Sequence, residues 1–256
     1  MSGEATASPL TSERASVTKR RPVTIAICSH DNQVRIEWAM GLKGMQHPMG
    51  RSITTMVIGG QSINDARNLA FEKAIEEGSE FLFMYDYDIV PRRQDVLSDM
   101  LSVMDLNKSI SVLGGVYPRR DRAHPEPIVI AEKGGGVSWD WQDGQLHDVY
   151  MTGTGFTCFR LDDFVAIRDE LPEYSYEGAA HDGRKGPTWL YCGLTASGVL
   201  ITDDGYLGTI CAKHDLRWVV HGGVICDQID MDGHLYKVED AKPKTIAEKP
   251  LVAQEA

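Results

Sequence analysis

The 256-residue chain lacks the features that mark several large classes of protein. No apolar run approaches the roughly 20 residues that cross a bilayer, so we expect no membrane span. Basic residues are outnumbered, with 26 Lys and Arg against 37 Asp and Glu and a net charge of −11. Because a nucleic-acid-binding face needs clustered Lys and Arg, we expect no nucleic-acid partner.

The cysteine and histidine patterns also exclude common kinds of site. The five cysteines are odd in number and form no C-x-x-C pair, and no two of the eight histidines have H-x-x-x-H spacing. This usage favours reduced thiols in a cytoplasmic protein over a disulfide framework or a zinc site. Residues 1–21 lack the apolar segment of a secretory signal, so we expect a disordered tail there and a second loose tail over 239–256.

The first half of the chain alternates between strand-like and helix-like patterns. Apolar, β-branched runs predict strands at 23–28, 53–58, 81–85 and 110–117, and helical spacing predicts helices at 34–45, 64–77 and 91–104. Strands that alternate with helices in this way predict an α/β fold, with a mainly parallel, doubly wound sheet flanked by helices.

The second half is less regular. Pro, Gly and Trp between residues 118 and 150 favour hairpins, and we expect helices over 160–171 and 203–214 and a late strand over 217–220. We therefore predict a single domain over 22–238, with a regular half to residue 117 and an irregular half from residue 118.

The clearest candidate for chemistry is the segment FLFMYDYDIVP, where Asp86 and Asp88 follow a short apolar strand. Open α/β sheets bind ligands at the carboxyl ends of their strands. Two carboxylates at such a place suit a divalent cation, which in turn neutralises a diphosphate. The alternative is a solvated turn at a strand end, where Asp is common.

Three further segments each have a functional and a structural interpretation. Arg67, at the start of a predicted helix, could pair with a carboxylate or a phosphate, or be an exposed residue beside a cap. Gly153 and Gly155 in MTGTGF could let backbone approach a ligand, or serve a bulge. Asp203 and Asp204 could cap a helix, or one of them could act as a general base.

In this order, the segments resemble the GT-A glycosyltransferases, in particular small bacterial and phage members of the family 2 type. NDARNLAFEKAIEEGSEFLFMYDYDIVP resembles the segment that leads into the D-x-D motif of that family. GGVYPRR, MTGTGF and TDDGYLGTICAKHDLRW follow in the usual order, and the match spans about residues 22–230. The resemblance implies a GT-A (Rossmann-like) fold with a nucleotide-binding half over 22–117 and an acceptor-side half over 118–238.

The same resemblance implies the substrates and the metal. The donor is a nucleotide-diphosphate sugar, the acceptor carries a hydroxyl group, and the cofactor is a divalent cation, Mn²⁺ or Mg²⁺. Asp88 becomes a direct metal ligand, and Asp86 contacts the metal or the ribose. Ser29 and His30 lie near the nucleotide base.

The remaining roles follow from the matching motifs. Arg67 supports the D-x-D loop or the diphosphate, and Gly153 and Gly155 form a glycine-rich loop near the donor sugar. Asp203 stands where the family has Glu, and Asp204 becomes the base. That assignment implies inversion at the anomeric carbon.

One position departs from the family. Where the family commonly has a late histidine that completes the metal site, this chain has Gln228. A Gln carbonyl is a weaker ligand for manganese than imidazole. His221 or His234 could take its place, or Asp88 could hold the metal with only the diphosphate and water.

Two other functions compete with glycosyl transfer. The D-x-D segment also resembles the nucleophile motif of haloacid-dehalogenase-type phosphohydrolases, in which Asp86 would attack phosphorus and Asp88 would act as acid and base. The strand before that motif usually opens the fold, however, and here two strand–helix units precede it. The third possibility is a nucleotide-sugar binder without turnover, which the departure at Gln228 would fit.

Overall fold

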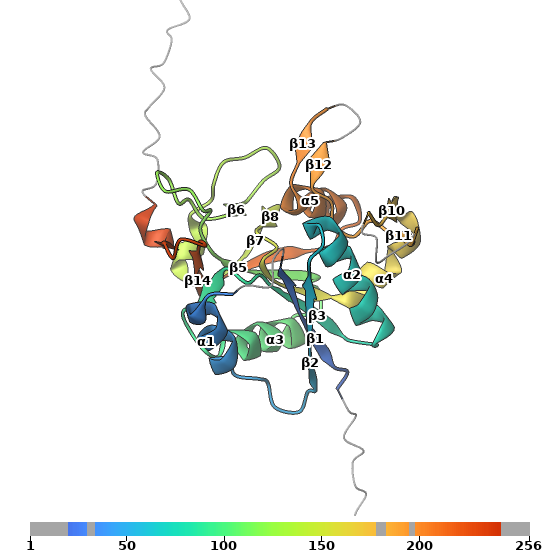
Figure 1. Ribbon diagram of the computed structural model, residues 1–256, viewed down its shortest axis with the longest axis horizontal. Helices are drawn as coiled ribbons and strands as arrows, with labels where there is room; N and C mark the ends of the chain where they lie inside the picture. Colours follow the sequence, from blue (N-terminus) through green and yellow to red (C-terminus); the bar gives the residue numbers. More distant parts are fainter. Residues whose placement is uncertain (1–19, 30–33, 178–182, 195–197, 242–256) are drawn as a thin grey trace, which may run out of the picture.

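The computed structural model describes residues 20–29, 34–177, 183–194 and 198–241. These residues form one large mixed sheet with helices on both faces (Figure 1). All five cysteines carry free thiols. No helix in the described ranges is long and apolar enough to cross a bilayer. His30 lies outside these ranges, and so do residues 1–19 and 242–256, which make up most of the two predicted tails.

The large sheet has the strand order β15-β14-β5-β9-β3-β1-β2, with β4 and β7 also paired to β14. Its strands are β1 (Val23–Ser29), β2 (Ile53–Gly59), β3 (Phe81–Tyr85), β4 (Ile89–Pro91), β5 (Val112–Val116), β7 (Leu146–Asp148), β9 (Phe156–Arg160), β14 (Trp218–Ile229) and β15 (Leu235–Tyr236). Strands from both halves of the sequence share this sheet, and β2, β1, β3, β5 and β14 point the same way.

Three short ladders lie outside the large sheet. They pair β6 (Val129–Ile130) with β8 (Met151–Thr152), β10 (Glu173–Ser175) with β11 (Lys185–Pro187), and β12 (Gly193–Leu194) with β13 (Leu200–Ile201). Short 3-10 turns are η1 (Asp140–Asp143), η2 (Arg168–Glu170) and η4 (Val238–Asp240).

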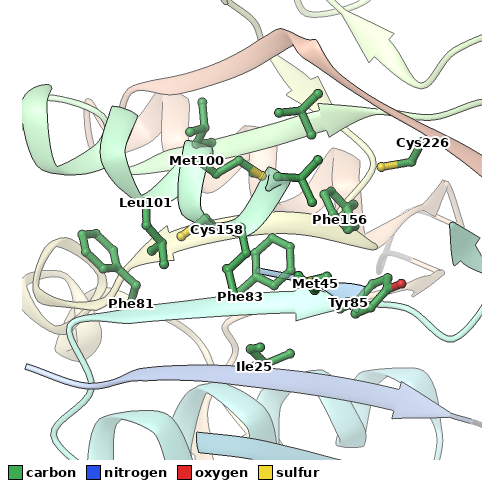
Figure 2. Close-up of a cluster of buried hydrophobic side chains, with 14 of the residues drawn as sticks. Ile25, Met45, Phe81, Phe83, Tyr85, Met100, Leu101, Phe156, Cys158 and Cys226 are labelled. Atoms are coloured by element: carbon green, nitrogen blue, oxygen red, sulfur yellow. The ribbon is translucent and has the colours of Figure 1, made fainter. Parts of the chain in front are cut away.

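The helices cover the two faces of the sheet. One face carries α1 (Ile36–Gly44) and α3 (Val96–Leu106), and the other carries α2 (Ile63–Glu76), α4 (Leu161–Ala166) and α5 (Asp203–Lys213). Alternate residues of β3 serve the two layers: Phe81, Phe83 and Tyr85 pack toward α3, whereas Leu82 and Met84 pack toward α2. Figure 2 shows the first layer, with the β3 aromatic side chains beside Met100, Leu101 and Phe156.

The predicted doubly wound parallel sheet needs correction at β9. This strand lies between β3 and β5 and is antiparallel to both. We predicted a helix from residue 160, but the helix α4 begins at Leu161 and lasts six residues before η2. The sequence FTCFR is buried at every position, so it shows no alternation of polar and apolar residues that would identify a strand.

Two further boundaries differ from the predictions. In both cases the cause is pairing with a strand that is distant in the sequence. We expected a helix to open at Pro91, but residues 89–91 form β4, which pairs with β14, and α3 begins only at Val96. We expected the late strand to end at residue 220, yet β14 continues to Ile229. Its register with β5 shifts between Val220 and Ile225, around two glycines that suggest a strand end in the sequence.

Polar side chains along α2 hold a distant extended segment against that helix. Asn64 exchanges two hydrogen bonds of 2.8 Å with the backbone of Cys192. Asn68 donates to the Leu190 carbonyl at 2.7 Å and accepts from the Trp189 N–H at 2.7 Å, and Glu72 accepts from the Trp189 indole at 2.8 Å. These side chains replace the missing β-partner of residues 189–192, the segment that leads toward α5.

Asn68→Ala should therefore lower the free energy of unfolding by about 2–4 kcal/mol, because it leaves a buried carbonyl and a buried N–H unpaired. Lys73→Ala is the matched control: Lys73 is exposed on the same helix, and its replacement should change stability by less than about 0.5 kcal/mol. Urea denaturation measures both. Equal stability of the two variants would show that the ladder is not stabilising.

Candidate functional site

A buried ionic cluster joins the segments that the sequence singled out. Arg67 is 6% exposed, and its guanidinium donates to Asp86 Oδ2 at 2.7 Å. The same guanidinium forms an ion pair with Asp203 and a hydrogen bond to the hydroxyl of Thr154. Arg67 therefore ties the start of α2 to the end of β3, the glycine-rich loop and the start of α5.

Neighbouring carboxylates keep the guanidinium of Arg67 protonated. Burial alone would lower the pKa of this guanidinium, but the nearby carboxylates of Asp86 and Asp204 outweigh that effect and raise it. A buried cation of this kind is stable only when it is paired and hydrogen-bonded. Arg67 is therefore a buried ion-pair partner of Asp86 and not an exposed residue beside a helix cap.

The glycine-rich loop closes over the carboxyl end of β3. The Asp86 N–H donates to the Gly155 carbonyl at 2.8 Å, and the Gly155 N–H donates to the Tyr117 hydroxyl at 2.9 Å. A Cβ at Gly155 would lie 2.5 Å from Asp86 Oδ2, and one at Gly153 would overlap the Tyr117 ring. Close approach between loop, strand end and Tyr117 is therefore what requires glycine at both positions.

The two acids at the start of α5 are held by the same loop. Asp204 Oδ1 accepts from the Thr154 N–H at 2.7 Å, and Asp203 Oδ2 accepts from the Thr154 hydroxyl at 2.8 Å. The helix cap is neither acid but Thr202, whose hydroxyl accepts from the Gly205 N–H. Burial raises the pKa of Asp204, while Arg67 and Thr154 act in the opposite direction. A carboxyl group with a raised pKa in a site of this kind is suited to proton transfer.

Asp88 points to a different neighbourhood from Asp86. It is 7% exposed, its Oδ2 accepts from Gln228 Nε2 at 3.0 Å, and it pairs with Arg120 at 3.2 Å. Burial and the Asp86 charge raise the pKa of Asp88 to about 6, against the opposing effects of Arg120 and Gln228. Gln228 Oε1 is buried without a hydrogen-bond partner.

The predicted metal ligands Asp86, Asp88 and Gln228 each have a partner within the protein. Each carboxylate is paired with a guanidinium, and Gln228 turns its N–H, not its carbonyl, toward Asp88. Within the described ranges, no three His, Cys, Asp or Glu side chains are grouped to hold a metal ion. Gln228 Oε1, which has no hydrogen-bond partner among the described residues, is a buried acceptor that could turn to a cation, and a single neutral oxygen is a weak ligand.

The two histidines that we considered as substitute ligands contact other residues. His221 Nε2 lies 3.5 Å from Asp99, and its Nδ1 accepts from the Gly223 N–H. His234 packs edge-on against Tyr236, with ring centroids 4.5 Å apart.

An apolar cavity of about 380 Å³ lies beside the cluster, at the ends of β1 and β2. Its lining residues are Ile27, Ser29, Val34, Trp38, Leu42, Thr55 and Val57. Trp38 connects it to the D-x-D loop, because its indole N–H donates to the Asp86 carbonyl at 2.8 Å. Of the two residues that we placed near a nucleotide base, Ser29 lines this cavity and His30 lies outside the described residues.

Several residues of the site were not singled out in the sequence. Tyr117 and Arg120 lie within GGVYPRR, and Thr154 lies within MTGTGF, so the motifs were found but not these side chains. Their partners come from other segments, and only the fold brings them together. Trp38 carried no signal beyond being an apolar residue in a predicted helix.

Comparisons with known proteins concern the fold. No model of a known protein family matches the chain, and no curated protein matches its sequence. Among solved structures, A197 from STIV is similar, with a TM-score of 0.53, 14% sequence identity, and coverage of 84% of this chain and 93% of that chain. At this identity, the similarity shows a shared fold and nothing about activity.

The pKa of Asp88 predicts an unusual pH dependence of stability. A carboxyl group with a raised folded-state pKa stabilises the protein below its unfolded pKa near 4, and this contribution is lost as the pH rises through about 6. Asp88→Asn avoids that loss. Between pH 4 and pH 8, its unfolding free energy should gain up to about 3 kcal/mol relative to the wild type.

Denaturant unfolding at both pH values measures this gain. Asp169→Asn removes the same charge from an exposed position and should differ from the wild type by less than about 0.5 kcal/mol at either pH. A difference between Asp88→Asn and the wild type that stays constant from pH 4 to pH 8 would contradict the raised pKa.

Proposed function

We propose that the protein is a glycosyltransferase that moves a sugar from a nucleotide-diphosphate sugar to a hydroxyl acceptor. The observation that supports this most is the convergence of four separate motifs on one buried cluster. Asp86, Arg67, the loop at Thr154, and Asp203 with Asp204 meet at the carboxyl end of β3. Ligands of open α/β sheets bind at such strand ends.

The surroundings of the cluster suggest how the donor would lie. The cavity that contains Ser29 and Trp38 is apolar and large enough for a nucleobase. From there, the diphosphate would extend past the Asp86–Asp88 turn, and the sugar would lie under the loop at Gly153 and Gly155. Both glycines are buried against Tyr117 and Asp86, and they hold the loop close to that path.

In the proposed reaction, Asp204 takes the proton of the acceptor hydroxyl. The acceptor oxygen then forms a bond to the anomeric carbon from the face opposite the diphosphate, and the bond from that carbon to the diphosphate oxygen breaks with its electron pair. The result is an inverted glycosidic linkage. Arg67 and Thr154 position Asp203 and Asp204 and do not touch the substrate in this scheme.

The binding site for the acceptor would lie in the irregular half of the chain. A second cavity, of about 560 Å³, lies there, lined by apolar side chains, two glycines and the Arg119–Glu126 ion pair. Trp139 and Met151 contribute to its wall, and Met151 precedes the glycine-rich loop by two residues. An aromatic wall of this kind suits stacking against a sugar ring.

The phosphohydrolase alternative fits this geometry less well. It requires Asp86 to attack phosphorus, yet Asp86 Oδ2 is held by Arg67 and faces the backbone of Gly155. It also requires Asp88 to exchange protons with substrate, whereas Asp88 is buried between Gln228 and Arg120. The metal ion that the family resemblance implies stays a prediction, and the scheme above uses no step through it.

The test of this function is Asp204→Asn, assayed with a panel of UDP- and GDP-sugars. Nucleotide-diphosphate affinity, measured by calorimetry, should stay within about twofold of the wild type. Transfer of the sugar to an acceptor or to water, measured as release of nucleoside diphosphate, should fall by about 10²–10⁴-fold, because the proton acceptor is lost. Asp215→Asn, an exposed residue just beyond the far end of α5, is the matched control.

Each other outcome identifies a different function. Retained turnover in Asp204→Asn would refute Asp204 as the base. Donor binding by the wild type without turnover of any sugar would identify a binding protein. Turnover of a generic phosphate monoester, but not of nucleotide sugars, would identify a phosphohydrolase.

A further inference from the structure

Two arginine side chains, Arg120 and Arg35, lie against the segments that hold Asp88, and the acids beside Gly233, Asp230 and Asp232, are paired with a third, Arg122. Arg120 Nη1 lies 3.2 Å from Asp88 Oδ2. Arg35, at the start of α1, lies against Gly233, where an added Cβ would be 3.6 Å from its guanidinium. Gly233 belongs to the turn that directly follows Gln228 and Ile229, and the Ile229 N–H donates to the Asp88 carbonyl.

Arg120 contacts Asp88 and is also partly exposed to solvent. Its side chain is 47% exposed, whereas the Asp88 side chain that it contacts is 9% exposed. Gln228 holds the same Asp88 oxygen at 3.0 Å, so the carboxylate is fixed in place. A guanidinium has five N–H donors in a rigid fork, and one contact to Asp88 leaves others directed at solvent.

Arg35 differs from the other partly buried arginines of the site. Arg67 has two carboxylate partners, Asp86 and Asp203, and also bonds to the Thr154 hydroxyl. Within the described ranges, Arg35 has no carboxylate partner, and its Nε, like that of Arg67, is buried without a hydrogen-bond partner. Val34, beside Arg35, lines the apolar cavity, and an anion that extends from that cavity would stabilise this half-buried cation.

We propose that Arg120, together with Arg35, binds the diphosphate of the nucleotide donor and supplies the positive charge that the family resemblance assigns to a divalent cation. Asp88 is then a positioning residue for Arg120, not a metal ligand. Two guanidinium groups match the charge of one divalent ion, and their planar forks suit phosphate oxygens. They would also stabilise the charge that develops on the leaving diphosphate. This inference rests on the proposed function.

The experiment is calorimetric titration of UDP and GDP into the full chain, once with EDTA and once with Mn²⁺. The wild type should bind in EDTA, and Mn²⁺ should change the affinity by less than about threefold. Arg120→Gln should weaken binding by about 10- to 100-fold in both conditions, because hydrogen bonds to a charged group are lost. Arg35→Gln should weaken it by about tenfold.

Arg217→Gln is the matched control. It removes the same charge from a similarly exposed side chain, whose partner is Asp148, and should leave the affinity within about twofold. The positioning role of Asp88 is tested by a double-mutant cycle. If Asp88 acts through Arg120, Asp88→Asn should weaken binding in the wild type and add nothing to Arg120→Gln.

A metal site at Asp88 makes the opposite prediction. Arg120→Gln would then remove a competing cation, and Mn²⁺-dependent binding would persist or strengthen. That result, or wild-type binding that requires Mn²⁺, overturns this inference and leaves the proposed function standing. Absence of UDP and GDP binding in every condition, by protein that circular dichroism shows to be folded, overturns both.

Discussion

The arrangement of the site depends on the burial of one positive charge. Moving a guanidinium out of water costs several kcal/mol, and Arg67 recovers this only through simultaneous contact with Asp86, Asp203 and Thr154. These partners come from three separate segments, so the cost of leaving the cation unpaired fixes their relative positions. Loss of any one partner removes a hydrogen bond that helps to hold the others, which makes the cluster a cooperative unit.

The direction of β9 determines which loop can join that unit. Because β9 runs antiparallel to β3, the beginning of β9 meets the end of β3, and Phe156 stands opposite Tyr85. The residues just before β9 therefore lie over Asp86, where the Gly155 carbonyl accepts from the Asp86 N–H. A parallel strand in this place would carry its preceding loop to the opposite edge of the sheet. The departure from a parallel sheet is thus what delivers Thr154 to the site.

The sequence allowed prediction of the parts of the fold in which local pattern and tertiary role agree. The apolar runs of β1, β3 and β5 and the start of α2 are of this kind, and so is the D-x-D turn that follows β3. It did not allow prediction of β4, β9 or the full length of β14, because those strands exist through pairing with distant segments. The same holds for side chains: Arg120 and Gln228 both contact Asp88, which lies 32 and 140 positions away in the sequence.

The hydrogen-bond ladder on α2 has a consequence for the chain that follows it. Asn64 fixes the backbone at Cys192, and Thr202 caps α5 ten residues later, so both ends of this short stretch are anchored independently of what lies between them. The described residues in between include the exposed apolar side chains of Leu194, Val199 and Leu200. This hairpin can consequently change in length or composition without moving Asp203 and Asp204. The length of this hairpin is therefore decoupled from the geometry of the buried cluster.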